Sequence, residues 1–479
     1  MLPVNTYRGK RVAVFGLGRS GLSAVRALAA GGAEVLVWDD DPNRRLDAAK
    51  LGAATAPPTE AAWQGIAALV LSPGVPLSHP RPHPVVGLAN RLGAEILGDV
   101  ELFARGRPVA AVAAITGTNG KSTTTSLLAH ILSASGRRVE AGANLGRPVL
   151  DFEVLGAGDV YVLELSSYQL DLTTGLRPNV AALLNVSPDH LDRHGGMNGY
   201  IAAKRRLLDM ARPDADLVIG VDGEYSARIA QDMRAKGCRV VEVSVDRELA
   251  DGIFVRDGHL FRAGAAAPVA DLNGIETLRG AHNWQNAAVA FALAEALGLT
   301  PRQIVAALSS YPGLPHRMEV VARQGGVLFV NDSKATNAEA VAHALAAYDH
   351  IYWIAGGIAK QGGIDGLAPH FSRIERAYLI GEAAHAFAKS LDGVLEHEVS
   401  GDLATAVRAA HDAAVGTGGV VLLSPACASF DQFASFEARG DRFRDLAQGI
   451  AESGDLNGDN NGDDNGDNGY PRRVAGGAL

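Results

Sequence analysis

Short apolar runs alternate with amphipathic stretches along almost the whole chain, and this alternation limits the possible folds more than any other feature of the sequence. Apolar runs of strand length that are followed by stretches of helical periodicity are typical of parallel sheets covered by helices. The runs form three groups, with strands expected at residues 11–15, 33–38 and 66–71, then 109–115, 160–165 and 180–186, and finally 327–331, 351–355, 377–380 and 420–423. The sequence therefore predicts an α/β fold with mostly parallel sheets.

The length of the chain and its turn-forming residues divide it into domains. A chain of 479 residues corresponds to about three domains of ordinary size. Glycine and proline collect at 105–108 and 311–315, as expected where domains join. The last stretch is rich in Asn, Gly and Asp, and it has too few apolar side chains to form a core. We therefore expect domains at 1–106, 107–312 and 313–452, followed by a disordered polar tail at 453–479.

The net charge and the few cysteines exclude several classes of protein. A formal net charge of -9 argues against a nucleic-acid partner, because proteins that bind phosphate backbones carry a basic surface. The two cysteines, Cys238 and Cys427, are too few for a disulfide framework and too far apart for a metal knuckle. No apolar run approaches the roughly twenty residues that span a bilayer. We expect a cytoplasmic protein that does not insert into membranes.

A glycine-rich loop with a lysine and a serine lies between an expected strand and a stretch of helical periodicity. The segment reads Ile115-Thr-Gly-Thr-Asn-Gly-Lys-Ser-Thr123, with the helix expected at 124–133. The backbone N–H groups of such a loop and of the helix N-terminus bind phosphate. Lys121 can reach the outer phosphates of a nucleotide, and the Ser122 hydroxyl can ligate Mg²⁺. The two glycines enclose two residues rather than the usual four, so an ordinary glycine turn is the alternative.

A second glycine-rich turn follows the first expected strand. Gly16-Leu-Gly-Arg-Ser-Gly21 has the spacing of a dinucleotide fingerprint, and Asp39 ends the next strand. Taken alone, this pattern suggests NAD. The turn can bind any diphosphate, however, and the acid any neighbouring polar group, so a UDP-linked substrate fits at least as well.

Polar residues also cluster after two strands of the middle group, in Leu163-Glu-Leu-Ser-Ser-Tyr-Gln169 and in Asn185-Val-Ser-Pro-Asp-His-Leu-Asp-Arg-His194. The carboxyl ends of parallel strands are where α/β sheets bind their ligands. Glu164 and His190 suit Mg²⁺ beside a triphosphate. His190 and His194 could instead bind zinc from one face of a helix, or the segment could simply be a solvated loop. The proline and glycines around the histidines favour a loop over a helix.

Lys204 falls on the apolar side of an expected helix at 200–208. Ile201, Lys204 and Leu208 share one face of this helix. The lysine could extend past that face to reach water. A desolvated lysine instead has a lowered pKa, and its neutral amine can take up CO₂ to form a carbamate, an anion able to ligate Mg²⁺. The spacing does not decide between the two.

Polar residues of the last group again follow strands. Asp332 and Lys334 come directly after one strand, Lys360 lies in a glycine-rich loop after the next, and Ser429 follows a third. Each of these side chains could bind a ligand or belong to an ordinary turn.

Taken together, these segments resemble the Mur ligase family over roughly residues 8–450. Thr-Gly-Thr-Asn-Gly-Lys-Ser-Thr marks the wider family, which includes folylpolyglutamate synthases, whereas Asn-Asp-Ser-Lys-Ala-Thr-Asn and Leu-Ser-Pro-Ala-Cys-Ala-Ser are more specific to members that add D-glutamate. The Asp-Asn-Pro-Arg signature of diamino-acid-adding members is absent. The resemblance implies three domains: a Rossmann-like N-terminal domain for a UDP substrate, a central P-loop ATPase-type domain with a mostly parallel sheet, and a Rossmann-like C-terminal domain for an amino acid.

The resemblance also implies a reaction and its cofactors. ATP, with two Mg²⁺ ions, phosphorylates the carboxylate of UDP-N-acetylmuramoyl-L-alanine, and the amine of D-glutamate then displaces phosphate. Catalytic roles are implied for Lys121, His190 and Lys204, the last as a carbamylated lysine. The metal ligands would be Ser122, Glu164, His190 and Lys204. The implied partners are these small-molecule substrates, and we expect a monomer.

Each binding role carried over by motif has its own residues. ATP would be held by Gly117, Thr118, Asn119, Gly120, Lys121, Ser122, Thr123, Asn283, Asn286, Arg317 and Asp332. The UDP substrate would be held by Ser20, Asp39, Ser72, Gly74, Asn144, Ser166 and His190. The amino acid would be held by Lys334, Thr336, Lys360, Ser429 and Phe436. The chain departs from the family at Asp39-Asp-Asp41, where an arginine near the uracil is expected.

Three other functions fit part of the sequence. Another ligase of the same family would add L-alanine, or glutamates to folate. An NAD-dependent dehydrogenase would use the fingerprint at 16–21 together with Asp39. A non-catalytic nucleotide-binding module would bind ATP without releasing phosphate when substrate is added.

Overall fold

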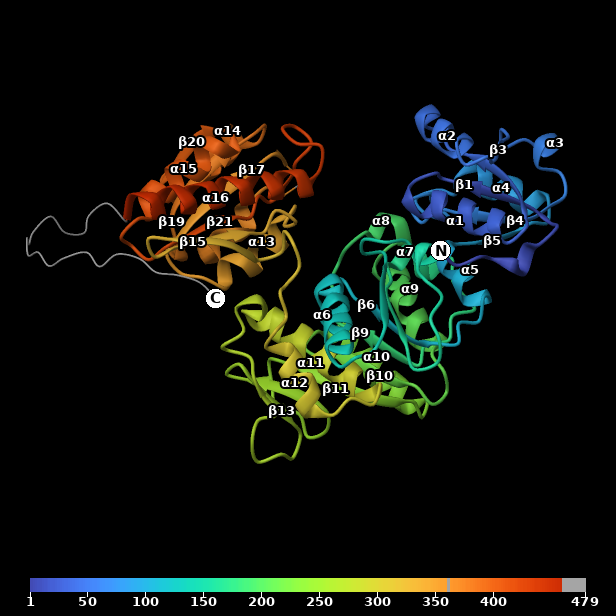
Figure 1. Ribbon diagram of the computed structural model, residues 1–479, viewed down its shortest axis with the longest axis horizontal. Helices are drawn as coiled ribbons and strands as arrows, with labels where there is room; N and C mark the ends of the chain where they lie inside the picture. Colours follow the sequence, from blue (N-terminus) through green and yellow to red (C-terminus); the bar gives the residue numbers. More distant parts are fainter. Residues whose placement is uncertain (360–361, 459–479) are drawn as a thin grey trace, which may run out of the picture. The chain divides into compact units, whose positions relative to one another are not determined.

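The computed structural model describes residues 1–359 and 362–458, and the chain divides into two compact units. Unit 1 is Met1–Leu314 and unit 2 is Pro315–Leu479. Both contain largely parallel sheets with helices on their faces (Figure 1), which confirms the predicted α/β class. The finer domain ranges 1–106, 107–312 and 313–452 remain a proposal. Lys360 and residues 459–479 of the predicted tail lie outside the described residues.

The first sheet of unit 1 has five parallel strands in the order β3-β2-β1-β4-β5. Its elements are η1 (Asn5–Tyr7), β1 (Arg11–Phe15), α1 (Arg19–Ala30), β2 (Glu34–Trp38), α2 (Pro42–Ala49), β3 (Ala54–Thr55), α3 (Glu60–Trp63), β4 (Ile66–Leu71), α4 (Pro84–Arg91), β5 (Glu95–Leu97) and α5 (Asp99–Arg105). Since β1 pairs with β2 on one side and β4 on the other, the strand order reverses at β1. Sheets of this kind bind ligands at that point, beyond the carboxyl ends of the strands.

The second sheet of unit 1 has nine strands in the order β14-β13-β12-β11-β10-β9-β6-β8-β7, in which β13 pairs antiparallel with β12 and β14 and the other pairs are parallel. Its strands are β6 (Ala111–Thr116), β7 (Val139–Ala143), β8 (Val160–Glu164), β9 (Val180–Leu183), β10 (Asp216–Gly220), β11 (Arg239–Ser244), β12 (Ile253–Arg256), β13 (His259–Arg262) and β14 (Ala270–Asp271). Its helices are α6 (Lys121–Ala134), η2 (Val149–Asp151), α7 (Ser167–Asp171), α8 (Leu191–His194), α9 (Met197–Met210), α10 (Glu224–Ala235), η3 (Glu276–Leu278), α11 (Ala281–Ala296) and α12 (Pro301–Leu308).

Alternate residues of β6 enter two different cores, because successive side chains of a strand point to opposite faces of the sheet. Ala113 and Ile115 pack with α6, α11 and α12, whereas Val112 and Ala114 pack on the side of α9 and α10. The second of these cores continues without a break into the first sheet and α5, where Phe103 meets Tyr161 edge to face at 5.1 Å. The two sheets of unit 1 are therefore held together by a shared core.

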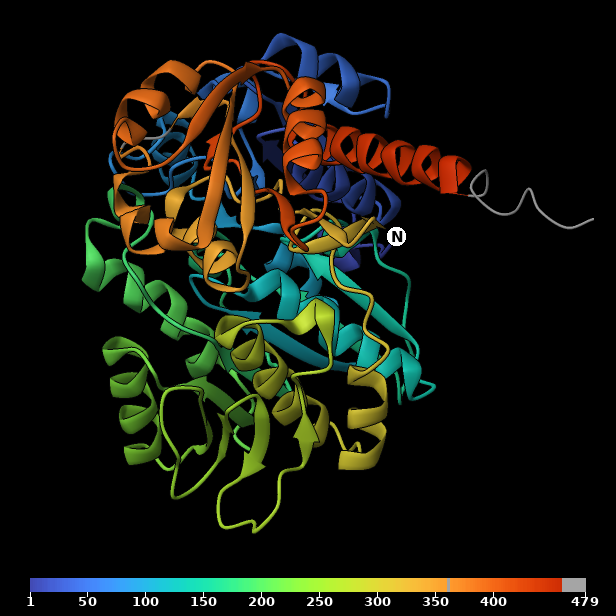
Figure 2. The same cartoon turned by 90° about the vertical axis from the view of Figure 1, so that its left-hand side faces the viewer.

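Unit 2 contains a six-stranded sheet in the order β15-β16-β21-β17-β19-β20, in which only β15 is antiparallel, and a small antiparallel pair, β18 with β22. Its elements are β15 (Glu319–Gln324), β16 (Val327–Asn331), α13 (Ala338–Ala346), β17 (Ile351–Gly356), β18 (Ile358–Ala359), η4 (Asp365–Arg373), β19 (Ile374–Ile380), α14 (Ala384–Leu391), β20 (His397–Gly401), α15 (Leu403–Ala414), β21 (Val420–Leu423), β22 (Cys427–Ala428) and α16 (Phe436–Gly458). The long helix α16 is drawn in red (Figure 2).

Several predicted boundaries differ from those of the structure. The strand expected at 109–115 begins at Ala111, because Pro108 has no N–H to pair and Val109 is 76% exposed. The strand expected at 180–186 ends at Leu183, after which Asn185 turns to bind the loop that follows β6. The helix α6 begins before the expected position, and α16 extends beyond 453 into the range predicted as a disordered tail.

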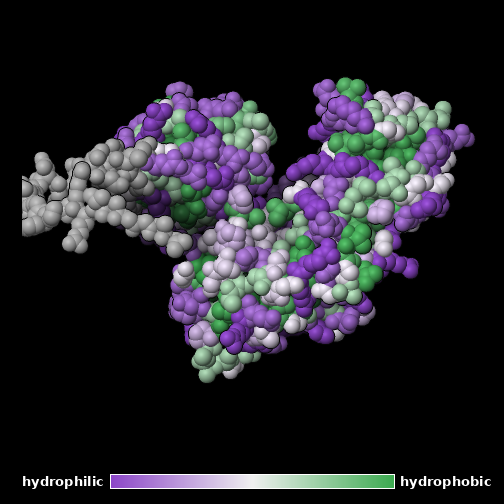
Figure 3. All heavy atoms as spheres, viewed as in Figure 1, coloured by the Kyte–Doolittle hydropathy of each residue, from purple (hydrophilic) through white to green (hydrophobic). Residues whose placement is uncertain are grey.

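The surface gives little indication of function. Hydrophilic and apolar residues are interspersed over the face of each unit that Figure 3 shows. Among residues 1–359 and 362–458, no helix has both the length and the apolar character needed to cross a bilayer. The features that distinguish a site lie instead at the carboxyl ends of the strands.

Candidate active site

The loop between β6 and α6 brings a lysine amine over a turn of backbone. Lys121 Nζ donates to Gly117 O at 3.0 Å and to Thr118 O at 2.8 Å. Gly120 has φ of +82°, and a Cβ there would lie 2.2 Å from Asn286 Oδ1. Glycine is therefore required at this position both by its conformation and by the closeness of α11. The loop presents the N-terminus of α6 and a cation to the same space, as phosphate binding requires.

Two segments that carry asparagines form hydrogen bonds with the glycine-rich loop after β6 and with α6. Asn185, after β9, accepts from Thr118 N through its carbonyl at 3.0 Å and from Asn119 N through its side chain at 2.9 Å. On α11, Asn286 accepts from the Thr124 hydroxyl and donates to Asn283 Oδ1 at 3.1 Å. Asn283 and Asn286 are both buried. The structure therefore places these two predicted ATP residues next to the loop that precedes Lys121.

Glu164 ends β8, the strand next to β6, and is in register with Ile115. Its side chain is 2% exposed, and Oε1 accepts from Asn144 Nδ2 at 2.6 Å. The other oxygen, Oε2, is buried without a hydrogen-bond partner among the described residues. A buried carboxylate oxygen without a partner is costly unless a cation or donor binds it. Glu164, with the buried Ser122 at the start of α6, therefore fits the hard oxygen ligands that Mg²⁺ prefers.

Lys204 lies inside the protein and does not reach water. It is 2% exposed, and its Nζ donates to Gly117 O at 2.6 Å and lies 4.6 Å from the centre of the Tyr200 ring. The same carbonyl accepts from Lys121. Burial, and secondly the charge of Lys121, hold the pKa of Lys204 well below its usual value. The alternative in which this lysine extends to solvent is therefore wrong, and the neutral amine is favoured.

The two histidines after β9 differ in their surroundings. His190 is about half exposed, adopts φ of +50° before α8, and lies 5.2 Å from the Tyr168 ring. His194 is buried, with Nε2 2.9 Å from Ser167 Oγ and Nδ1 3.4 Å from Asp171. Because both ring nitrogens of His194 are occupied, the arrangement does not suit a shared zinc. The segment is also not the plain loop predicted, since Leu191–His194 forms one helical turn.

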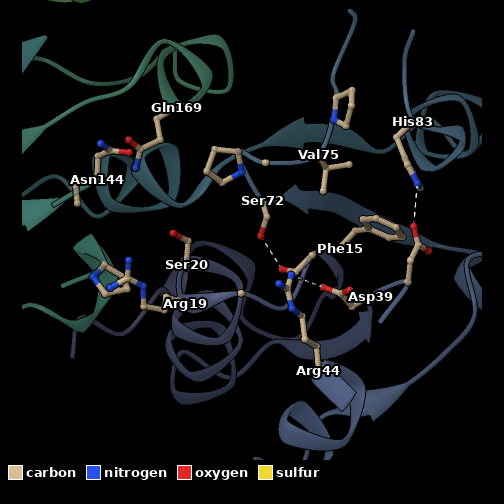
Figure 4. Close-up of a pocket in the computed structure, with 18 of the residues that line it drawn as sticks. Phe15, Arg19, Ser20, Asp39, Arg44, Ser72, Val75, His83, Asn144 and Gln169 are labelled. Carbon is tan, nitrogen blue, oxygen red and sulfur yellow. Dashed lines mark hydrogen bonds and ion pairs between the residues drawn. The ribbon is translucent and has the colours of Figure 1, made fainter. Parts of the chain in front are cut away.

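A cavity of about 530 Å³ lies between the two sheets of unit 1, beyond the carboxyl ends of β1 and β4. Five of the residues predicted to bind the UDP substrate line it, namely Ser20, Asp39, Ser72, Gly74 and Asn144. Asn144 and Gln169 lie at one end of this cavity, and Asp39, Arg44 and His83 at the other (Figure 4). Ser166 and His190 do not line it. The Ser166 hydroxyl caps α7 together with Gln169, so Gln169 reaches the cavity in its place.

Asp39 and Arg44 organise the far end of this cavity. Asp39 Oδ2 accepts from Leu17 N at 2.6 Å, which fixes the glycine-rich turn, and Arg44 Nη1 lies 3.7 Å away. Arg45 stacks instead on Trp38, at 4.4 Å. Arg44, in the first turn of α2, therefore brings an arginine to the end of the cavity where Asp39 lies.

In unit 2, candidate residues gather at the end of β16. Asp332 is buried and accepts from Ser424 Oγ at 2.8 Å and from Met318 N at 3.3 Å. The charge of Arg317 acts on its carboxylate. Lys334 Nζ lies 3.9 Å from the centre of the Phe436 ring, at the start of α16. Phe436 therefore orients the lysine through a cation–π contact.

A buried arginine connects three loops that follow neighbouring strands of unit 2. Arg439 on α16 is 1% exposed. Its guanidinium donates to Ser333 O at 2.9 Å after β16, to Gly356 O at 3.4 Å at the end of β17, and to Cys427 O at 3.1 Å after β21. Its Nε also donates to Ser333 Oγ, which in turn donates to Phe436 O at 2.8 Å. One side chain thus fixes the loops that carry the predicted amino-acid residues.

Three family models match the chain in the order of its sheets. The Mur ligase MurD-like N-terminal domain matches residues 10–98, the Mur ligase middle domain 115–294, and the Mur ligase glutamate ligase domain 316–427. The chain belongs to the Mur ligase family. The predicted resemblance is thereby confirmed.

Curated relatives and solved structures agree with this membership. The UDP-N-acetylmuramoylalanine--D-glutamate ligase of Nitrobacter hamburgensis is 53% identical over 459 residues, which cover 94% of this chain and 98% of the relative. The protein of that name from Rhizobium meliloti is 53% identical over 92% of this chain and 97% of its own. The structure of UDP-N-acetylmuramate-alanine ligase from Thermotoga maritima has a TM-score of 0.59 at 17% identity, covering 92% and 99% of the two chains. At that identity the likeness shows the fold alone.

Sequence reasoning missed several residues that the structure of this Mur ligase brings to its candidate site. Arg44, His83 and Gln169 line the cavity between the two sheets of unit 1, and Asn185 and Arg439 position loops. Asn185 was within a segment already singled out, and its place directly after β9 was the available signal. Gln169 likewise ends a segment already singled out. Arg44, His83 and Arg439 read as ordinary polar residues in or next to helices, and nothing in their spacing connects them to distant parts of the chain.

The buried carboxyl of Asp332 should make the free energy of unfolding depend on pH. Burial raises the pKa of Asp332 to about 7 from the usual 3.8, although Ser424 and Arg317 oppose the shift. Since the folded pKa lies above the unfolded one, the fold favours the neutral acid, and its contribution is lost as pH rises from 3.8 to about 7. The melting temperature of Asp332→Asn should therefore depend less on pH in this range than that of the wild type. If calorimetry gave the same dependence of melting temperature on pH for the two proteins, the raised pKa of Asp332 would be contradicted.

Proposed function

We propose that this Mur ligase joins D-glutamate to UDP-N-acetylmuramoyl-L-alanine, with ATP converting the substrate carboxylate to an acyl phosphate. The relatives that match more than nine-tenths of the chain carry this activity in their name. At the site, the proposal rests on three groups around the ends of β6 and β8: the Lys121 amine, the Lys204 amine and the Glu164 oxygen that has no hydrogen-bond partner among the described residues. A carboxylate is a poor electrophile until one oxygen becomes part of a leaving group, and phosphorylation supplies that leaving group.

Phosphoryl transfer takes place at the loop after β6. A carboxylate oxygen of the muramoyl-alanine attacks the γ-phosphorus, and the bond to the ADP oxygen breaks. Lys121 balances the charge that moves between the phosphates. Ser122 and Glu164 would hold one Mg²⁺, and His190 and a carbamylated Lys204 would hold a second. Mg²⁺ bound there would neutralise the crowded phosphate oxygens. Burial lowers the pKa of Lys204 and so favours the unprotonated amine, which in this proposal takes up CO₂ and loses a proton to become a carbamate anion.

The UDP substrate occupies the cavity between the sheets of unit 1. Its diphosphate lies against the turn after β1, near Ser20, and its uridine toward Asp39 and Arg44. The peptide end then points to Asn144, whose side chain is hydrogen-bonded to Glu164. This orientation directs the reacting carboxylate toward the predicted metal ligands. It also gives the glycine-rich fingerprint a role other than NAD binding.

The amino acid is bound by unit 2. D-Glutamate presents two carboxylates, which need cations and hydroxyl donors on more than one side. Lys334 and Thr336 follow β16, and Ser429 follows β21 with a buried hydroxyl that has no hydrogen-bond partner among the described residues. Lys360 is assigned to the same group by motif. The amine attacks the acyl carbon, and phosphate leaves with the oxygen that came from the substrate.

The test of this proposal follows that oxygen. UDP-N-acetylmuramoyl-L-alanine labelled with ¹⁸O in its carboxylate should yield inorganic phosphate that contains ¹⁸O, formed only when ATP, Mg²⁺ and D-glutamate are all present. Unlabelled phosphate together with amide product would contradict an acyl phosphate.

The cytoplasmic location and the monomeric state remain predictions.

The contacts of Arg439 lead to a prediction about the binding of D-glutamate by unit 2. It is a positioning residue, and Arg439→Met removes its donors while keeping much of its volume. Charge-assisted hydrogen bonds are worth roughly 1.5–3 kcal/mol each, so the loops should lose their order and the KM for D-glutamate should rise about tenfold or more, with a smaller change for ATP. Arg439→Lys should recover part of the loss. The control is Arg442→Met, an exposed arginine of the same helix; equal KM values for D-glutamate in the two methionine variants would refute the role.

A further inference from the structure

Unit 1 contains a second cavity, of about 660 Å³, at the end of the nine-stranded sheet opposite the phosphate loop. Its walls are the segment 104–112, which joins α5 to β6, the turns before β8 and β9, and Arg212 after α9. These elements meet there because β6, β8 and β9 are parallel and all begin at this edge. No residue assigned above to ATP, the UDP substrate or the amino acid lines this cavity.

Four arginines line this cavity, Arg105, Arg107, Arg177 and Arg212, and no carboxylate side chain of the described residues does so. The chain as a whole carries a net charge of -9, so this concentration of positive charge runs against its composition. Like charges gathered around one cavity repel each other, and an anion between them relieves that repulsion.

Two of the arginines are held in place by the protein. Arg105 forms ion pairs with Glu95 and Glu101, at 2.8 and 2.9 Å. Arg177 donates from Nη1 to Thr174 O at 3.0 Å and to Leu176 O at 2.7 Å. Backbone carbonyls do not neutralise a guanidinium, so Arg177 keeps its full charge at the cavity.

The other two are exposed and weakly paired. Arg107 forms no ion pair within the described part of the chain, and its backbone has φ of +49°, directly after α5. Arg212 lies 3.7 Å from Asp214, a carboxylate that is 78% exposed and therefore well screened by water. Arg107 and Arg212 can both turn to a ligand without breaking a buried contact. Arg107, Arg177 and Arg212 together offer several planar forks of N–H donors, which match phosphate oxygens in geometry.

Apart from Asn179, whose side-chain oxygen accepts from Val112 N at 2.9 Å, the side chains that line the cavity beside the arginines are apolar. Pro108, Ala110, Val112 and Leu176 contribute carbon surface next to the arginines. A bare anion would leave this surface in water, whereas an anion with a hydrophobic body would cover it. The volume is in the range of about 300–1,000 Å³ that small-molecule sites occupy.

We propose that this cavity is a second ligand site, which binds a small organic phosphate with its phosphate on Arg107, Arg177 and Arg212 and its apolar part on Pro108 and Leu176. A ligand bound there joins the segment between the two sheets to the turns before β8 and β9. β6 begins at this site and ends at the phosphate loop, so the ligand contacts the far end of the strand that carries Lys121. The site does not depend on which amino acid the enzyme adds.

Phenyl phosphate is the probe that matches both halves of this site. Calorimetric titration of the full-length protein, with UDP and ADP present to occupy the nucleotide sites, should show one further binding event. The double variant Arg107→Gln with Arg212→Gln should weaken it by tenfold or more, since each arginine contributes charge-assisted hydrogen bonds. Arg228→Gln is the matched control, an exposed arginine of α10, and should leave the affinity unchanged.

Two comparisons complete the test. Phenol should not bind, and inorganic phosphate should bind more weakly than phenyl phosphate because it leaves the apolar wall uncovered. Equal affinity for phenyl phosphate in the wild type and the double variant, or no binding beyond the nucleotide sites, would overturn the proposal. The variants remain informative because Arg107 and Arg212 are exposed and their removal leaves the core intact, which thermal melting checks directly.

Discussion

Replacement of Lys121 by alanine should lower kcat by about 10²- to 10³-fold, the loss typical when one group that stabilises transition-state charge is removed. The Lys121 amine lies over the loop, on Gly117 O and Thr118 O, where it acts most strongly while negative charge moves between phosphates. Substrate binding uses several other contacts, so the KM for the UDP substrate should change little. Steady-state kinetics with phosphate release as the readout measures both.

The fold should survive this change, because the lysine contributes no apolar packing. Lys389→Ala, an exposed lysine of α14, is the control for loss of a positive charge. Near wild-type turnover in Lys121→Ala would remove the phosphate-loop assignment. A lower melting temperature together with lost turnover would instead mean that Lys121 supports the loop structure.

The second large effect is expected at Lys204. Lys204→Met should reduce activity by more than about 100-fold, since even residues that only support metal ligands contribute about 10- to 100-fold. Lys204→Arg should not restore activity, because arginine keeps a positive charge where the carbamate is an anion. Wild-type activity should fall in buffer freed of CO₂ and return when bicarbonate is added.

Removal of CO₂, together with the Lys204 variants, distinguishes a carbamate from a lysine that only supports the structure. Lys204 is buried against Tyr200 and Gly117, so methionine can fill much of the same space and the melting temperature serves as the check on folding. Full activity of Lys204→Arg would refute the carbamate. A wild-type enzyme that ignores CO₂ removal while Lys204→Met is inactive would do the same, and would assign Lys204 a direct contact with phosphate.

The local parts of this architecture were predictable from the sequence. A strand, a glycine-rich turn and a helix are adjacent in the chain, so the positions of Lys121 and Ser122 follow from short-range geometry. Asp39 was identified for the same reason, since it directly follows β2, the strand beside β1. The burial of Lys204 was predictable only in part. Helical periodicity placed it on an apolar face of α9, but only the packing of α9 against the loop after β6 shows that its amine does not reach water.

The parts that depend on long-range packing were not predictable. Gln169 rather than Ser166 lines the cavity between the sheets of unit 1, since the Ser166 hydroxyl caps its own helix. Arg44 lines the same cavity from the first turn of α2, and the spacing of residues along the chain does not reveal this position. Arg439 reads as a polar residue of an amphipathic helix. Only the fold shows that it binds backbone carbonyls after three strands that are neighbours in the sheet but far apart in the sequence.

The most direct test of the account is the choice of acceptor. Purified enzyme should be given ATP, Mg²⁺ and UDP-N-acetylmuramoyl-L-alanine, with D-glutamate, L-glutamate and L-alanine compared by kcat/KM for phosphate release and by the mass of the product. We expect D-glutamate to be strongly preferred, because inversion at the α-carbon cannot place both carboxylates and aim the amine at the acyl carbon together. Equal use of L-glutamate or L-alanine would contradict the D-glutamate assignment.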